Sequence, residues 1–576
     1  MTADNSDDGG KNGDIIAVAP AHQPIIEEGT GATLKEGAKA REVFNAELYA
    51  AIHDSPINPR SKQSFHLYFA IFVAFCCACA NGYDGSLMTS ILAMQHFQDT
   101  FKSGKDGPWV SLIFSIYSVG NMVGSPFAAM LSDKFGRRKA MFCGGCVIIL
   151  GMIIISTASH LAQFVVGRFV LGFGIAIMTV AAPAYSIEIA PPHWRGRCTG
   201  NPIRQAYTSG WIIAKTRAGF YNCGWFGGSI PAAAVTFGTN NIDSNISWRL
   251  PLILQAFACI VVMIGVFFIP ESPRYLLANG RDQEALDFLV KYHGNGNSDS
   301  KLVALEIQEM RENIALDGID KRPLDYRPLF LTHNGRWRMT QVLMISIFGQ
   351  WSGNGLGYFN TVIFEQLGVK SVSQQLGYNL LTSVLSAVGA LTAVSQTDRM
   401  PRRPVLVFGT LACAAALAAN AGLSSALDAQ QSRGNIQESY AKGALASYFL
   451  FNIIFSFTYT PLQGVIPAEA LETTMRAKGL AASAFIVSAM GFLSQFALPI
   501  GFQNIQYKVV YIFVAWDVIE AIAWYLFAVE SQGRTLEQLE WIYNQKSPVK
   551  ASKKVDKVVV QADGAVTEKI VSHVDG

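Results

Sequence analysis

Long apolar segments, separated by short polar loops, follow one another along the chain from residue 65 to residue 528. A helix needs about 20 mainly apolar residues to cross a bilayer. Twelve segments meet that requirement: 65–94, 108–131, 139–157, 161–187, 219–239, 249–269, 338–362, 375–396, 403–423, 441–463, 477–501 and 507–528. The pattern predicts an all-α integral membrane protein with twelve transmembrane helices.

Composition and charge support this class. Hydrophobic residues make up 50% of the chain and charged residues 15%, against roughly 25% charged in soluble proteins. The nine cysteines lie mostly in or beside the apolar segments, which is typical of packing residues and not of a disulfide framework. Lys and Arg gather in alternate loops, at 133–139, 193–197, 398–403 and 475–479. The positive-inside rule then places both termini in the cytosol.

Three stretches lie outside the apolar segments. Residues 1–64 are polar and Gly-rich, without the apolar core of a signal peptide, and predict a disordered cytosolic tail. Residues 270–337 carry apolar positions at helical spacing, which predicts amphipathic linker helices on the cytosolic side. Residues 529–576 form a cytosolic C-terminal tail, whose basic stretch 546–557 we expect to be solvated or to face lipid.

Short motifs recur in the same order in the two sets of six segments. "DKFGRR" at 133 returns as "DRMPRR" at 398, and "ESPR" at 271 returns as "ESQGR" at 530. Glu188 precedes Arg195 by seven residues, as Glu469 precedes Arg476. These matches predict a duplicated six-helix half, at 65–269 and again at 338–528.

The first half is longer than the second between matched positions. Glu188 to Glu271 spans 83 residues and Glu469 to Glu530 spans 61, a difference of 22, and the polar stretch 201–218 supplies 18 of them. We hypothesise that 201–218 is a retained intron, because the codons at its two ends can form splice sites. The alternative is a loop insertion, which surface loops tolerate at little cost.

Two opposite charges lie inside apolar segments of the first half. Asp84 is in the first segment, and Arg168 is the only Lys or Arg within the segments of this half apart from their ends. Each charge costs about 2.5 to 3.5 kcal/mol at the centre of a membrane helix. We therefore expect the two groups to pair, with protonation of Asp84 breaking the pair. A fixed ion pair that only orients two helices is the alternative.

Further motifs identify a family. They are "GYD" (82–84), "DKFGRR" (133–138), "GRFVLG" (167–172), "PESPRYL" (270–276), "PAEALETTMRAKG" (467–479) and "GRTLE" (533–537). With these motifs in this order, residues 65–545 resemble a sugar porter of the major facilitator superfamily. "NGYDGSLM" (81–88), "GQWSGNGLGYF" (349–359) and "TPLQG" (460–464) are most similar to its fungal lactose-permease-like branch. The resemblance implies proton symport of a disaccharide, lactose- or cellobiose-like, or of a hexose across the plasma membrane.

Sugar recognition needs amides that bind hydroxyls and aromatic rings that stack on the sugar. The seventh segment offers Gln350, Trp351, Asn354, Tyr358 and Asn360, and Gln350 and Asn354 share one helical face. The resemblance assigns Gln350 and Asn222 to amide positions of the family's sugar site. A hydrogen bond between helices is the alternative for each amide. Ser386 and Leu498 stand where the family has asparagine, so the resemblance implies an altered pocket.

Charged residues at the cytosolic helix ends predict a gate between the halves. The gating residues that we expect are Asp133, Arg137, Arg138, Glu188, Arg195, Glu271, Arg274, Asp398, Arg402, Arg403, Glu469 and Arg476. The second-half motifs depart from the family pattern, with Pro401 in place of glycine and Val529 in place of proline. The second-half gate is therefore the less regular of the two.

The remaining expectations concern class and partners. We find no metal-ligand cluster, phosphate-binding loop or nucleophile motif, so we expect a transporter and not an enzyme, without cofactor or metal. Its expected partners are a small sugar, protons and membrane lipid, with no nucleic acid, and the chain is expected to be a monomer. A sugar uniporter is the nearest alternative. A sugar sensor without transport is disfavoured by the short C-terminal tail, and 201–218 leaves room for an inactive product.

Overall fold

A computed structural model gives the structure of the protein. It describes residues 58, 60–102, 107–191, 217–319, 327–396, 400–431, 438–471, 476–532, 534, 536–553, 555–560 and 566–571. One unit comprises Phe44–Val555 and Val571–Gly576, and a second comprises Met1–Val43 and Asp556–Ile570. Strands β1 (Val555–Val560) and β2 (Val566–Val571) form a two-stranded sheet. The proposed intron, 201–218, lies outside the described residues except for its last two positions.

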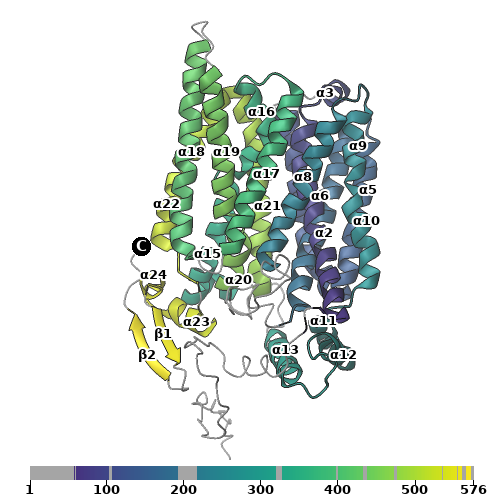
Figure 1. Ribbon diagram of the computed structural model, residues 1–576, viewed down its shortest axis with the longest axis vertical. Helices are drawn as coiled ribbons and strands as arrows, with labels where there is room; N and C mark the ends of the chain where they lie inside the picture. The colour runs from purple at the N-terminus through teal and green to yellow at the C-terminus, as the bar shows by residue number, and fades with distance from the viewer. Residues whose placement is uncertain are drawn as a thin grey trace, which may run out of the picture. The chain divides into compact units, whose positions relative to one another are not determined.

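The first half of the larger unit is a bundle of long helices (Figure 1). Its elements are α2 (Lys62–Ile91), α3 (Gln95–Phe101), α4 (Pro108–Phe135), α5 (Arg137–Ser156), α6 (Leu161–Glu188), α8 (Arg217–Thr239), α9 (Ile246–Leu254), α10 (Ala256–Gly265) and the 3-10 turn η1 (Val266–Phe268). Most of these helices carry apolar side chains toward the bundle centre and toward the outside alike, as expected for helices in lipid.

Four short helices connect the halves: α11 (Pro273–Ala278), α12 (Asp282–Tyr292), α13 (Lys301–Ile319) and α14 (Arg327–Leu331). All four lie within 270–337, the stretch for which linker helices were predicted. In Figure 1, α11, α12 and α13 lie at the lower end of the bundle, and α3 and α16 lie at the upper end. We call the lower end the linker end and the upper end the far end.

The second half repeats the helical bundle. Its elements are α15 (His333–Trp351), η2 (Asn354–Phe359), α16 (Asn360–Gln366), α17 (Val372–Gln396), α18 (Arg402–Gln431), α19 (Glu438–Thr458), α20 (Leu462–Ala470), α21 (Arg476–Ile505), η3 (Gln506–Lys508) and α22 (Val509–Phe527). Helices α23 (Leu536–Asn544) and α24 (Pro548–Ala551) follow. Within the predicted tail, Leu539, Ile542 and Tyr543 are buried against Val529, whereas Lys546 and Lys550 are exposed.

Helices lie at all twelve predicted positions. In the described part of the chain, nine helical stretches are long and apolar enough to cross a membrane, and the last, Lys478–Phe527, contains both α21 and α22. The less apolar α8 and α15 occupy two further predicted segments. The predicted all-helical, two-half membrane architecture is therefore confirmed.

Close contact between α4 and α6 depends on glycine. A Cβ atom added at Gly172 would overlap the carbonyl oxygen of Tyr117, and one added at Gly120 would overlap that of Phe169. Small residues allow such an approach between membrane helices. The contact holds Tyr117 of α4 against Arg168 of α6.

The two halves are joined at the far end. Thr89 donates a hydrogen bond to the carbonyl oxygen of Tyr358 at 3.0 Å, and Thr361 donates one to the carbonyl oxygen of Thr89 at 3.2 Å. Next to them, the Asn379 amide donates to the Ser90 hydroxyl at 3.0 Å. Each bond crosses from α2 to the second half, so the halves are closed on one another at this end.

Candidate functional site

The predicted ion pair between Asp84 and Arg168 is present. Arg168 Nη1 lies 2.6 Å from one carboxylate oxygen of Asp84 and 2.7 Å from the other. The side chains are 1% and 3% exposed. Helix α2 supplies the acid and α6 the base, so the pair joins two spanning helices of the first half.

Three neutral side chains surround the pair. Gln255 Nε2 donates to Asp84 Oδ1 at 3.2 Å, and the Arg168 guanidinium lies 4.7 Å from the ring centroid of Tyr117. The Tyr117 hydroxyl in turn donates to Asn81 at 2.9 Å. Charge, amide and aromatic face together stabilise the buried charges. The sequence analysis missed Gln255 and Tyr117, although a polar residue within an apolar segment is the signal that could have identified Gln255.

The ion pair also interacts with the second half. Tyr358 of η2 interacts electrostatically with Asp84 and Arg168, and its hydroxyl is hydrogen-bonded to Gln495 of α21. Ser118 of α4 donates to Gln495 at 2.8 Å. A chain of polar side chains therefore runs from the buried pair across the interface between the halves.

The predicted sugar-binding residues gather where α15 ends. The Asn354 amide donates to Gln350 Oε1 at 3.3 Å, so the two predicted amides share one place. Trp351 is directed differently, because its indole donates to the Met490 carbonyl at 3.3 Å and its ring lies 5.8 Å from that of Trp516. The side chain of Asn222 lies outside the described part of the chain.

The seventh predicted segment is not one continuous helix. Helix α15 ends at Trp351, Gly353 has a φ of +85°, and η2 begins at Asn354. The positive φ suits glycine. Broken helices in membrane proteins occur where the backbone is buried in protein or lines a cavity. We call residues 352–354 the α15 break.

Further polar side chains of the second half form hydrogen bonds between helices, and the sequence analysis named only Asn360 among them. The Asn360 amide donates to Asn379 at 2.8 Å, and the Tyr448 hydroxyl donates to Asn360 Oδ1 at 2.5 Å. Gln463 Nε2 donates to the carbonyl oxygen of Gly349 at 3.0 Å. Their amides stood inside apolar segments, but sequence spacing does not place residues of three different helices together.

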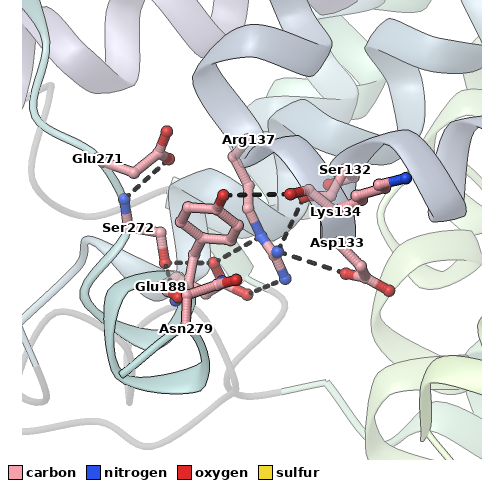
Figure 2. A network of polar contacts seen from close by, with 9 residues as sticks. Ser132, Asp133, Lys134, Arg137, Glu188, Glu271, Ser272 and Asn279 are labelled. Carbon is pink, nitrogen blue, oxygen red and sulfur yellow. Dashed lines mark hydrogen bonds and ion pairs between the residues drawn. The ribbon is translucent and has the colours of Figure 1, made fainter. Parts of the chain in front are cut away.

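Four of the predicted gating residues of the first half lie together at the linker end, namely Asp133, Arg137, Glu188 and Glu271 (Figure 2). Arg137 Nη2 donates to Glu188 Oε1 at 3.0 Å, and Arg137 Nη1 lies 3.3 Å from Asp133. Ser272 Oγ donates to Glu188 at 2.5 Å, and the Ser272 amide donates to Glu271 at 3.0 Å. The network therefore joins α4, α5 and α6 to the start of the linker.

The flanking charges are also engaged. Arg138 Nε donates to the carbonyl oxygen of Val266 at 2.9 Å. Burial raises the pKa of Glu271 above its usual value, while the Ser272 amide and Arg138 act to lower it. Arg274 has contacts within the protein as well.

The second half contains a corresponding network. Arg402 Nη2 donates to Glu469 Oε1 at 2.9 Å, and Ser531 Oγ donates to Glu469 Oε2 at 2.5 Å. The amides of Arg402 and Arg403 donate to the two oxygens of Glu530 at 2.9 and 3.0 Å. The less regular second-half motif therefore forms an ordered network, with Pro401 where the first half has Gly136 at a φ of +94°.

The contacts described for the first network join helices of the first half to the start of the linker. Those described for the second network join the second half to the segment that follows α22, and none of these contacts joins the two halves. Arg195, Asp398 and the side chain of Arg476 lie outside the described residues. Within the residues that the structure describes, no group of three or more His, Cys, Asp or Glu side chains is placed to hold a metal ion.

Comparison with known proteins agrees with this architecture. The chain is 28% identical over 494 residues to the MFS-type transporter criB of Aspergillus cristatus, covering 85% of this chain and 96% of criB. It is 28% identical over 499 residues to the high-affinity glucose transporter of Kluyveromyces lactis, covering 83% and 86%. Among solved structures, the proton:xylose symporter XylE bound to 6-bromo-6-deoxy-D-glucose superposes with a TM-score of 0.66 at 19% identity, covering 84% of this chain and all of XylE.

A family model identifies the chain. Its match extends from residue 69 to residue 543, which spans the helices of both halves and the linker between them. The family comprises membrane transporters and not enzymes, in agreement with the expectation from the motifs. The chain therefore belongs to the sugar (and other) transporter family.

Proposed function

We propose that the protein carries a small sugar across the plasma membrane in symport with a proton. The observation that carries this proposal is the ion pair of Asp84 and Arg168, which is buried inside the bundle at 2.6 Å. A nearby cation favours the charged form of a carboxylate, and protonation would remove the attraction between the two groups. The protonation state of Asp84 is thereby linked to the packing of α2 against α6.

Alternating access then depends on the contacts around the pair. Protonation of Asp84 removes its attraction to Arg168 and frees Gln255, whose amide donates to the carboxylate. Tyr358 of the second half interacts with the pair. A change in the charge of Asp84 would therefore alter an interaction between the two halves. Coupling of this kind permits the halves to rearrange only in one protonation state.

The sugar site is assigned to the α15 break and the residues on either side of it. Gln350 and Asn354 supply amide donors and acceptors of the kind that bind sugar hydroxyls, and Tyr358 supplies an aromatic ring. We retain Asn222 and Trp351 as candidates, with Trp351 acting through its packing on Trp516. The relatives include a glucose transporter of Kluyveromyces lactis, which favours a hexose or a disaccharide containing one.

The conformation corresponds to a carrier closed at the far end. The bonds from Thr89 and Ser90 to the second half close that end, and both gating networks lie within single halves at the linker end. We assign the linker end to the cytosol, because Lys and Arg concentrate in its loops. The sugar site would then open inward, with both termini cytosolic.

Uptake measurements test the proposal. Radiolabelled glucose, lactose and cellobiose are supplied to transporter-deficient yeast, with and without a protonophore, for the wild type, Asp84→Asn and the control Asp243→Asn. Asp243 is an exposed acid at the far end. We expect accumulation against a gradient that collapses with the protonophore and in Asp84→Asn alone. Equilibrating uptake that ignores the protonophore would make the protein a uniporter, in which the ion pair is structural.

A further inference from the structure

The last spanning helix carries two acidic side chains that coupling through Asp84 does not use. Asp517 and Glu520 lie one turn apart on α22, and both are fully buried. Neither forms an ion pair with any described residue. Both oxygens of Asp517 and Oε1 of Glu520 also have no hydrogen-bond partner in the described part of the chain. Carboxylates without a cation are costly inside a membrane, so this setting favours the protonated acids.

The hydrogen bonds at Glu520 point to the same state. The Ser352 hydroxyl is hydrogen-bonded to Glu520 Oε2 and also donates to the carbonyl oxygen of Phe348 at 2.8 Å. A serine hydroxyl has a single hydrogen. Both contacts can be full hydrogen bonds at once if Glu520, in its protonated form, donates to Ser352, whereas an ionised Glu520 would leave the Ser352 hydrogen for only one of the two acceptors.

A second hydroxyl at Glu520 is limited in the same way. Tyr459 contacts Glu520 Oε2 at 3.2 Å and Thr410 Oγ1 at 2.8 Å. The hydrogen of Thr410 is directed to the carbonyl oxygen of Leu406 at 2.7 Å, which leaves Tyr459 to donate to Thr410. Tyr459 then has no hydrogen left for Glu520, so neither hydroxyl would be a full donor to a carboxylate at this position, and the Trp516 side chain is the other group that contacts Glu520.

The contact with Ser352 places Glu520 at the α15 break. Ser352 is the residue between the end of α15 and Gly353, and it lies next to Trp351 in the chain. The ring of Trp351 packs on that of Trp516, which precedes Asp517. Helix α22 therefore contacts the break region twice, through the hydrogen bond between Glu520 and Ser352 and through the ring contact between Trp516 and Trp351.

We propose that Glu520, with Asp517 beside it, is a second proton-binding site, and that its protonated form holds the α15 break through Ser352. This inference rests on the proposed function in one respect, which is that the α15 break is part of the sugar site. When Glu520 loses its proton, the Ser352 hydroxyl can donate its one hydrogen either to the carbonyl oxygen of Phe348 or to Glu520, but not to both. The same loss places a negative charge in an apolar setting. The break is then less firmly held.

The surroundings contain few other titratable groups. Cys413 of α18 and Tyr459 after α19 interact with the acids. The remaining charged groups on the packed helices α15, α18 and α21 occur near helix ends, within the described ranges, at His333, Arg336, Arg338, Arg402, Arg403, Asp428 and Lys478. Glu520 and Asp517 are therefore the acids expected to titrate beside the break.

Hydrogen exchange tests this site without knowledge of the sugar. The full chain in lipid nanodiscs is exchanged at about pH 6 and about pH 9, and the rate of the peptide covering 352–359 is corrected for intrinsic exchange. We expect opening to increase about fivefold at the higher pH in the wild type, as for the loss of one hydrogen bond. The same increase is expected in Glu540→Gln, whose side chain is exposed.

Two substitutions should remove the response. Glu520→Gln keeps a neutral donor next to Ser352, and Ser352→Ala removes the partner, so neither should show a pH-dependent increase. Thermal unfolding at one pH establishes that these variants are folded. A wild type without the increase, or an increase that persists in Glu520→Gln, would overturn the site. The uptake measurement with Asp84→Asn tests the symport separately, so failure of this second site would leave the proposed symport standing.

Discussion

Asp84 and Arg168 lie 84 residues apart in the chain and 2.6 Å apart in the bundle. Because each neutralises the other, removal of one leaves a buried charge without its partner. Asp84→Asn and Arg168→Gln are each expected to lower the free energy of unfolding by about 3 to 5 kcal/mol. The double variant should lose less than the sum of the two, and thermal unfolding of the purified proteins measures this coupling. Strictly additive losses would contradict an energetically important pair.

The matched networks of the two halves should be of similar strength. Arg137 and Arg402 each donate to a glutamate from a largely buried position, so Arg137→Ala and Arg402→Ala should each cost about 1.5 to 3 kcal/mol. The control is Arg281→Ala, because Arg281 and Glu284 form an exposed pair, for which about 0 to 1 kcal/mol is expected. Thermal unfolding compares the three variants. A cost for Arg402→Ala no larger than that of the control would show the second network to be weak.

The raised pKa of Glu271 predicts a pH-dependent stability. The folded protein holds the proton of this carboxyl more tightly than the unfolded chain, so the contribution to stability is complete below the ordinary pKa of glutamate. It is lost as the pH rises through the folded-state pKa. The stability of the wild type relative to Glu271→Gln should therefore fall as the pH rises above the ordinary pKa of glutamate, about 4.3. The exposed Glu284→Gln serves as the control, and a difference that rises with pH would reverse the sign argued here.

Val529 replaces the proline that the family motif has before Glu530. Its amide donates to Gln341 Oε1 at 3.1 Å, a bond that proline cannot form. Val529→Pro should therefore destabilise the protein by about 1 to 3 kcal/mol, because a buried acceptor loses its donor. Val529→Ala keeps the amide and controls for lost packing. Equal stability of the two variants would mean that the hydrogen bond contributes little.

The proposed intron makes a prediction at the level of the message. The 18 residues of 201–218 correspond to 54 nucleotides, so transcripts that span this junction should be shorter by that length. A chain lacking 201–218 should be folded and should carry the same sugar. A uniform message that retains all 54 nucleotides, read by sequencing the transcript, would refute the intron and favour a loop insertion.

Several site features could be predicted from particular residues. Asp84 and Arg168 were expected to pair because an isolated charge within an apolar segment has few other solutions. The same reasoning applied to Asp517 and Glu520 would have marked the second acidic site, since both stand inside the segment 507–528. The amide pair of Gln350 and Asn354 followed from helical spacing, which here holds although α15 ends between them.

The sequence by itself determined the twelve spans and the two-half repeat, because apolar length and recurring motifs are local properties of the chain. Only the tertiary structure decided that Gln255 and Tyr117 stabilise the ion pair, that Trp351 packs on Trp516, and that Ser352 contacts Glu520. These partners belong to helices far apart in sequence. Their meeting depends on the rotation and contact of whole helices, which spacing along one helix does not specify.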